Sequence, residues 1–202
     1  MAKTAAKTAK TSELPPRERI LATAAELFYR HGIRAVGVDA IAEAAGTNKM
    51  TLYRHFASKD ELVADYLRRA VASAKDVVAD FERRHPGNPQ AQLADWLAAM
   101  AAEVASADER GCALANAAVE LPDKKHPARR VIEEFKLAER KRIGKLCRDA
   151  GLSDPDLLAD ELYLLLEGAR VTAQSIGGKE IGARFRKMSE TLIAAHCTHG
   201  KH

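Results

Sequence analysis

The sequence predicts an all-α protein of 202 residues. Hydrophobic residues recur at helical spacing along most of the chain, and Gly or Pro stands at the ends of the periodic segments. No run of alternating β-branched residues predicts a strand. We expect a three-helix, N-terminal helix-turn-helix domain followed by a larger helical C-terminal domain.

Four segments follow from this pattern. Residues 1–12 are Ala/Lys/Thr repeats with too little apolar surface to offset the entropy of ordering, which predicts a disordered basic arm over residues 1–14. Residues 15–62 form the first helical domain and residues 63–196 the second, and residues 197–202 are expected to be a flexible tail.

Three helices are expected within residues 15–62. The first begins at Pro15-Pro16 and ends at His31-Gly32, and the second covers residues 38–45 and stops at Gly46. Thr47 or Asn48 caps the third, over residues 49–56, which buries Leu52 and Phe56. A capping box from Ser58 to Glu61 opens a longer helix that runs to about Arg84.

Further helices fill the rest of the chain. Apolar stripes and breakers predict them near residues 93–104, 112–121, 127–150, 155–176 and 181–192. Asp154 is expected to cap the fourth of these, with Pro155 at its first position.

Composition limits the function classes. No apolar run is long enough for a membrane span, and the N-terminus lacks the apolar core of a signal peptide, so a cytoplasmic location is expected. Three widely spaced cysteines argue against a disulfide framework.

Residues 1–60 hold ten Lys/Arg and six Asp/Glu, whereas residues 61–202 hold 22 of each. A basic N-terminal segment attached to a neutral remainder suggests that this segment binds a polyanion.

The short helix, the Gly-containing turn and the next short helix within residues 38–56 have the size of a helix-turn-helix. With Leu52 and Phe56 buried, the other sides of the last helix carry no acidic residue. Such a helix can enter the major groove without repelling phosphates.

Residues 17–63 resemble the N-terminal domain of the TetR family of transcriptional regulators. The matching motifs are Ala25-x-Leu27-Phe28 with Gly32, Ile41-Ala42-x-x-Ala45-Gly46, and Lys49-x-Thr51-Leu52-Tyr53-x-x-Phe56-x-Ser58-Lys59-x-x-Leu62. The resemblance implies a DNA-binding regulator, commonly a repressor, whose C-terminal domain dimerises and often binds a small effector.

By position, the resemblance places one set of residues at or near double-stranded operator DNA: Gly37, Thr47, Asn48, Lys49, Met50, Thr51, Tyr53, Arg54, His55 and Lys59. Tyr53 and Lys59 are expected at phosphates. Two residues depart from the family pattern. Gly37 stands where Ser or Thr is common and offers no hydroxyl, and Met50 stands where a small residue is common. An unusual operator preference is therefore expected.

Residues 157–176 are apolar around much of the predicted helix, which therefore needs two surfaces to cover it. We expect a homodimer through the last two long helices; the alternative is a buried central helix in a monomer. A near-palindromic operator fits a twofold dimer.

Candidate ligand-binding residues combine apolar stripes with nearby polar groups. They are Trp96, Met100, Asn116, Glu120, Phe135 and Arg170. The alternative is ordinary core for the aromatic residues and partial exposure for the polar ones.

Two other function classes find no support in the sequence. No catalytic motif such as G-x-S-x-G, H-E-x-x-H or a phosphate loop is present, so neither an enzyme nor a cofactor is expected. A sequence-indifferent architectural DNA binder would need a more basic surface. The terminal histidines of residues 196–202 lack a second ligand cluster, so no metal site is expected.

Overall fold

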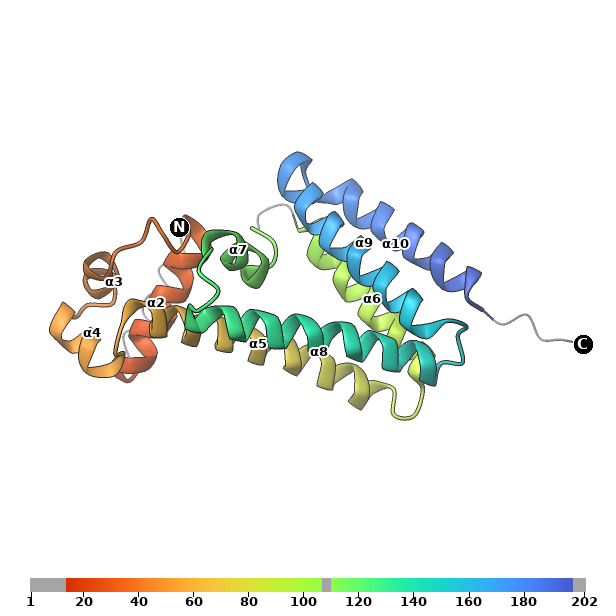
Figure 1. The fold of residues 1–202 in the computed structure, drawn as a ribbon, viewed down its shortest axis with the longest axis horizontal. Coiled ribbons are helices and arrows are strands. Elements are labelled where there is room, and N and C mark those ends of the chain that lie inside the picture. Colours follow the sequence, from red (N-terminus) through yellow and green to blue (C-terminus); the bar gives the residue numbers. More distant parts are fainter. Residues whose placement is uncertain (1–13, 107–109, 198–202) are drawn as a thin grey trace, which may run out of the picture. The chain divides into compact units, whose positions relative to one another are not determined.

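The computed structural model describes residues 14–106 and 110–197, and these residues form nine α-helices and no strand (Figure 1). The helices are α2 (Pro16–His31), α3 (Val38–Ala44), α4 (Lys49–His55), α5 (Lys59–Arg84), α6 (Pro89–Ala105), α7 (Ala113–Glu120), α8 (Pro127–Asp149), α9 (Pro155–Ile176) and α10 (Lys179–Ala195). The all-α prediction is confirmed. The basic arm of residues 1–13 and the tail beyond residue 197 lie outside the described residues.

The chain divides into two compact units. The first unit comprises residues up to 72 together with residues 113–133, and the second comprises residues 73–112 and 134 onward. The helices α5 and α8 each contribute to both units. The sequence placed every residue after 62 in one C-terminal domain, whereas here α7 and the start of α8 pack with the N-terminal helices.

The first unit is built around α2, α3 and α4, which pack against one another. Its core includes fully buried Ile20, Ile41 and Leu52. The helix α2 ends at Gly32, whose φ of +88° favours glycine and whose N–H donates to the Phe28 carbonyl at 3.0 Å.

The second unit holds α6, α9 and α10 side by side (Figure 1). Trp96, Leu162, Leu166 and Phe185 form its buried centre. At the contact of α10 with α6, a Cβ on Gly182 would lie only 2.5 Å from the Ala101 carbonyl oxygen. Glycine is required there because the two backbones approach closely.

Most predicted helix starts have the expected physical cause. The Asn48 side chain accepts the Thr51 N–H at 2.9 Å, and Ser58 Oγ accepts the Glu61 N–H at 3.1 Å. Asp154 stands at the predicted start of α9, but its side chain makes no cap hydrogen bond. Its φ of +43° is left-handed, whereas a capping side chain reaches the first turn from extended backbone. That part of the prediction was wrong.

Candidate nucleic-acid interface

The turn between α3 and α4 is fixed by backbone hydrogen bonds. The Thr47 N–H donates to the Ala42 carbonyl at 2.9 Å, and Gly46 has a φ of +61°, which allows the tight turn. Leu52 is fully buried and Phe56 is 3% exposed, so α4 is anchored from behind as the sequence predicted. The fixed turn and the two anchors give α4 one defined orientation within the first unit.

The outward side of α4 is polar, basic and aromatic. Lys49, Met50, Tyr53, Arg54 and His55 are exposed, with Met50 at 75%. Thr47 and Thr51 are half-buried beside them, and no residue of α4 is acidic. This side therefore offers several hydrogen-bond donors to an anionic partner, and Met50 adds an exposed apolar side chain.

Two of the predicted DNA-contacting lysines already have partners within the first unit. Lys49 Nζ lies 3.2 Å from an Asp39 carboxylate oxygen, and both side chains are more than half exposed. An exposed pair of this kind contributes only about 0.2–1 kcal/mol, so a phosphate can replace it.

Lys59 is held more firmly than Lys49. Its Nζ donates to the Ile33 carbonyl at 2.8 Å and lies 6.0 Å from the centre of the Phe28 ring. Burial lowers the pKa of Lys59, although Asp60 and Glu120 oppose that shift. Its phosphate contact stays a prediction.

Gly37 and Asn48 begin the two helices of the motif. Gly37 is exposed and extended, and no side-chain bond caps α3. Asn48 is exposed, but its side-chain oxygen is occupied by the Thr51 N–H. Its side-chain NH2 group is the part that can donate to DNA.

The six candidate ligand residues are divided between the two units. Asn116 and Glu120 belong to the first unit, where Glu120 accepts the Arg34 N–H at 3.0 Å. The other four belong to the second unit. Trp96 is fully buried in its core and Phe135 is half-buried. The structure thus does not gather the six residues around one cavity within either unit.

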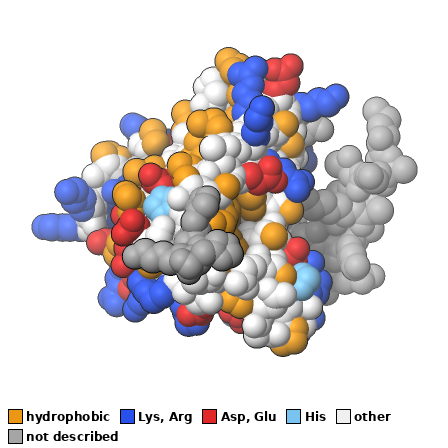
Figure 2. Space-filling view, turned by 90° about the vertical axis from the view of Figure 1, so that its right-hand side faces the viewer, with side chains coloured by type: hydrophobic (Ala, Val, Ile, Leu, Met, Phe, Trp, Pro, Cys, Tyr) orange, Lys and Arg blue, Asp and Glu red, His pale blue; other side chains and the backbone are white. Residues whose placement is uncertain are grey.

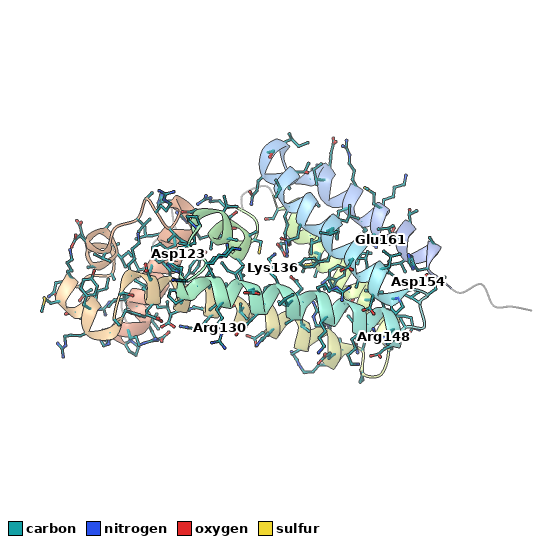
Figure 3. All side chains as sticks on the ribbon, viewed as in Figure 1. Asp123, Arg130, Lys136, Arg148, Asp154 and Glu161 are labelled. Carbon is teal, nitrogen blue, oxygen red and sulfur yellow. The ribbon has the colours of Figure 1, made fainter. Side chains whose placement is uncertain are left out.

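Arg170 is the centre of a buried ionic cluster in the second unit. It is 7% exposed, donates twice to Glu103 at 2.9 and 3.0 Å, and donates to Glu167 at 2.7 Å. Lys136, which extends from α8 toward α9, donates to the other Glu167 oxygen at 2.7 Å (Figure 3). Burial lowers the pKa of Arg170, but Glu103 and the other acidic groups around it together raise it by more, so that the net shift is upward. Met100 is half-buried, and its sulfur lies 3.7 Å from an Arg170 nitrogen.

Among the buried polar atoms of the second unit that have no hydrogen-bond partner are Trp96 Nε1 and Glu139 Oε2. Glu139 is 8% exposed. Burial raises the pKa of its carboxyl group, although Arg170 and Lys136 oppose the shift. Sequence reasoning missed Glu139, because a lone glutamate at an ordinary helical position gives no signal of burial.

A cavity of about 390 Å³ adjoins the Arg170–Glu103 pair. It is lined by Glu103, Val104, Ser106, Arg110, Gly111, Arg170, Ala173, Gln174 and Gly177. Its volume falls within the range of small-molecule sites, roughly 300–1,000 Å³.

Metal sites, membrane-spanning helices and reactive thiols find little support in the described part of the chain. No group of His, Cys, Asp and Glu there could hold a metal ion, and no helix there could span a membrane. Cys112 and Cys147 are buried free thiols, and burial raises the pKa of Cys147 to about 11. At neutral pH, Cys147 is therefore a protonated core residue.

Comparison with known proteins matches residues 20–66 to the family model "Bacterial regulatory proteins, tetR family". The chain is 28% identical to SCO4454, a TetR-family transcriptional regulator of Streptomyces coelicolor, over 90% of this chain and 95% of that one, with a TM-score of 0.84. It is 30% identical to SAV143 of Streptomyces avermitilis, described as a candidate TetR transcriptional regulator, over 92% of this chain and all of that one, with a TM-score of 0.69.

Curated relatives match over the N-terminal helices. The transcriptional activator FasR of Mycolicibacterium smegmatis is 44% identical over 63 residues, which are 30% of this chain and 29% of FasR. Other relatives matched over a similar length are described as repressors. These matches confirm the resemblance predicted from sequence and the expectation of a regulator rather than an enzyme.

The raised pKa of Glu139 predicts how stability depends on pH. The folded state holds the Glu139 proton more tightly than the unfolded state, so folding loses stability as the pH rises above the ordinary value of 4.5. Replacing Glu139 with Gln removes the buried charge. The melting temperature of the variant should exceed that of the wild type at pH 7.5, and the difference should shrink toward pH 4.

Glu133→Gln is the matched control for this measurement, because Glu133 is an exposed glutamate on the same helix. Its melting temperature should follow the wild type at both pH values. A Glu139→Gln variant that is less stable than the wild type at pH 7.5 would contradict the assignment.

Proposed function

Because this chain belongs to the TetR family of bacterial transcriptional regulators, whose helix-turn-helix domain binds DNA, we propose that α4 recognises a specific operator sequence in the major groove. One observation carries the proposal: α4 is anchored by buried Leu52 and Phe56 and presents an acid-free outer side. A helix held in this way can place side chains on base edges at a defined depth.

The proposed contacts fall into two groups. Base edges are contacted by Thr47, Lys49, Met50, Thr51 and His55. Phosphates are contacted by Tyr53 and Lys59, with Gly37, Asn48 and Arg54 near the backbone of the DNA. Base contacts set sequence preference, whereas phosphate contacts set overall affinity.

Lys49→Ala should lower operator affinity by about 10- to 100-fold and relax the preference at one base position. Tyr53→Phe removes a hydroxyl and should weaken binding to all duplexes alike. Fluorescence anisotropy with a set of single-base operator variants distinguishes the two effects. Lys141→Ala, at an exposed lysine of the second unit, serves as the control and should bind as the wild type does. Wild-type affinity and preference in the Lys49→Ala variant would count against the proposal.

We further propose that the protein acts as a homodimer through α9 and α10. Leu158, Leu162 and Leu166 of α9 are fully buried in the protein's own core. The opposite side of α9 exposes Leu157, Leu164 and Val171 by 55%, 69% and 62%, and these residues repeat every seven positions. Exposed apolar residues in such a row are covered most simply by the same row of a second subunit. Ile176 near the end of α9 and Met188 of α10 are also exposed apolar residues, by 72% and 53%.

Leu164→Glu should convert the dimer to a monomer, because a twofold interface would bury two uncompensated charges. Sedimentation at micromolar concentration measures the change, and operator affinity should fall by at least about tenfold with the loss of the second half-site. Leu137→Glu is the control, since Leu137 is 63% exposed on α8 and lies outside the proposed interface. A Leu164→Glu variant that sediments as the wild type does would exclude this surface.

We also propose that the cavity beside Arg170 binds a small effector that lowers operator affinity, which makes the protein a ligand-responsive repressor. Two features of the second unit support a ligand there. The cavity has apolar lining residues, Val104 and Ala173, and its wall also carries the Arg170–Glu103 ion pair. A few fixed polar groups on a partly apolar wall are typical of an effector site. Coupling between effector and operator is typically worth about 1–3 kcal/mol.

Filling the cavity tests the effector proposal. A metabolite library should contain compounds that release the wild-type protein from operator DNA, and Ser106→Trp should abolish that response while retaining operator affinity. Ser106 lines the cavity, whereas Ala102 is exposed elsewhere on α6, so Ala102→Trp should respond as the wild type does. A Ser106→Trp variant with an unchanged response would place the effector elsewhere.

A sequence-indifferent architectural role is disfavoured by the charge distribution. Residues 1–60 hold only ten Lys/Arg against six Asp/Glu, and on the face drawn in Figure 2, which is turned toward the C-terminal helices, basic, acidic and hydrophobic side chains are intermingled. Proteins that bind DNA without sequence preference rely on a more uniformly basic surface.

A further inference from the structure

We propose that Glu120 of α7 is a positioning residue for DNA recognition, because its carboxylate fixes the loop that leads into the helix-turn-helix. This inference rests on the proposed recognition of an operator by α4. Glu120 would then contribute to DNA recognition although it lies outside the family's N-terminal domain, 65 positions beyond His55.

The contact joins Glu120 to the loop between α2 and α3. Oε2 of Glu120 accepts the backbone N–H of Arg34 at 3.0 Å. The same carboxylate lies against Gly32, where a Cβ would be 3.0 Å from Oε2 and 3.1 Å from Oε1. Glycine at position 32 therefore provides both the positive φ that ends α2 and the space that the carboxylate fills.

A second contact holds the same loop from α5. Lys59 Nζ donates to the Ile33 carbonyl at 2.8 Å, and Glu120 and Lys59 attract each other electrostatically. Ile33 and Val36 of the loop are 5% and 6% exposed. The loop is thus bonded through one N–H and one carbonyl and anchored by two apolar side chains immediately before α3 begins at Val38.

The helix α7 is itself firmly built into the first unit. Leu114, Ala117 and Leu121 are buried, with Ala117 at 1% exposure. Arg129 donates to the Ala118 carbonyl at 2.8 Å, and His126 Nε2 lies 3.3 Å from an Asp60 carboxylate oxygen. The buried residues of α7 and the bond from Arg129 fix where α7 presents Glu120 to the loop.

Within α7 itself, the position of Glu120 is energetically unfavourable. It is the last residue of α7, where the helix dipole disfavours a negative charge. The contacts that compensate this cost are the Arg34 N–H and the nearby Lys59 ammonium, and both lie outside α7.

The test compares Glu120→Ala with Glu120→Gln in the full chain. Dissociation constants are measured at one salt concentration for the selected operator and for an unrelated duplex. Glu120→Ala removes the acceptor, so specific affinity should fall by about tenfold or more while nonspecific affinity stays constant. Glu120→Gln keeps a side-chain oxygen that can accept the Arg34 N–H, so it should restore specific affinity to within about threefold. Val119→Ala is the control, because Val119 is 85% exposed on the same helix and should behave as the wild type does.

Hydrogen exchange of the Arg34 amide provides the second readout, and it remains informative if Glu120→Ala fails to fold. The amide should be protected in the wild type and in Glu120→Gln. An unchanged ratio of specific to nonspecific affinity in folded Glu120→Ala would overturn the proposal. So would rapid exchange of the Arg34 amide in the folded wild type, or equal loss of specificity in both Glu120 variants. A wild type that prefers no duplex sequence would instead refute the proposed function, while its Arg34 amide would still report on the contact.

Discussion

The burial of Leu52 and Phe56 behind α4 is the constraint on which the function of the structure depends. A helix of seven residues is too short to be stable alone, so packing must hold it in place. Because the apolar side of α4 is fixed against α2 and α3, its remaining side chains all point outward in one defined orientation. Sequence specificity requires this defined placement, because hydrogen bonds to base edges tolerate little displacement.

The same unit shows how a short motif acquires rigidity from distant parts of the chain. The loop before α3 is bonded by Lys59, just after the helix-turn-helix, and by Glu120 of α7, which lies far beyond it in the sequence. The second unit holds a different arrangement, in which Arg170 is neutralised by Glu103 and Glu167 within a mostly apolar core. Such ionic clusters are weak sources of stability, because removing the charges from water costs about as much free energy as their pairing returns.

Sequence reasoning predicted the features that depend on local periodicity. Helix ends at Pro16, Gly32 and Gly46, and the buried positions of α4, follow from patterns within a few residues. It could not predict which unit α7 joins, because an apolar stripe shows that a helix is buried but not which helices it packs against. The pairing of Lys136 with Glu167 was missed for the same reason, since contacts between helices depend on packing that periodicity does not encode.

Selection of binding sites from a random duplex pool by the wild-type protein, without effector and in moderate salt, tests the central claim most directly. The account predicts enrichment of one near-palindromic sequence, because two copies of α4 would contact bases from fixed positions in a dimer. Recovery of unrelated sequences at equal frequency would contradict it, since a helix anchored by Leu52 and Phe56 would then confer no specificity.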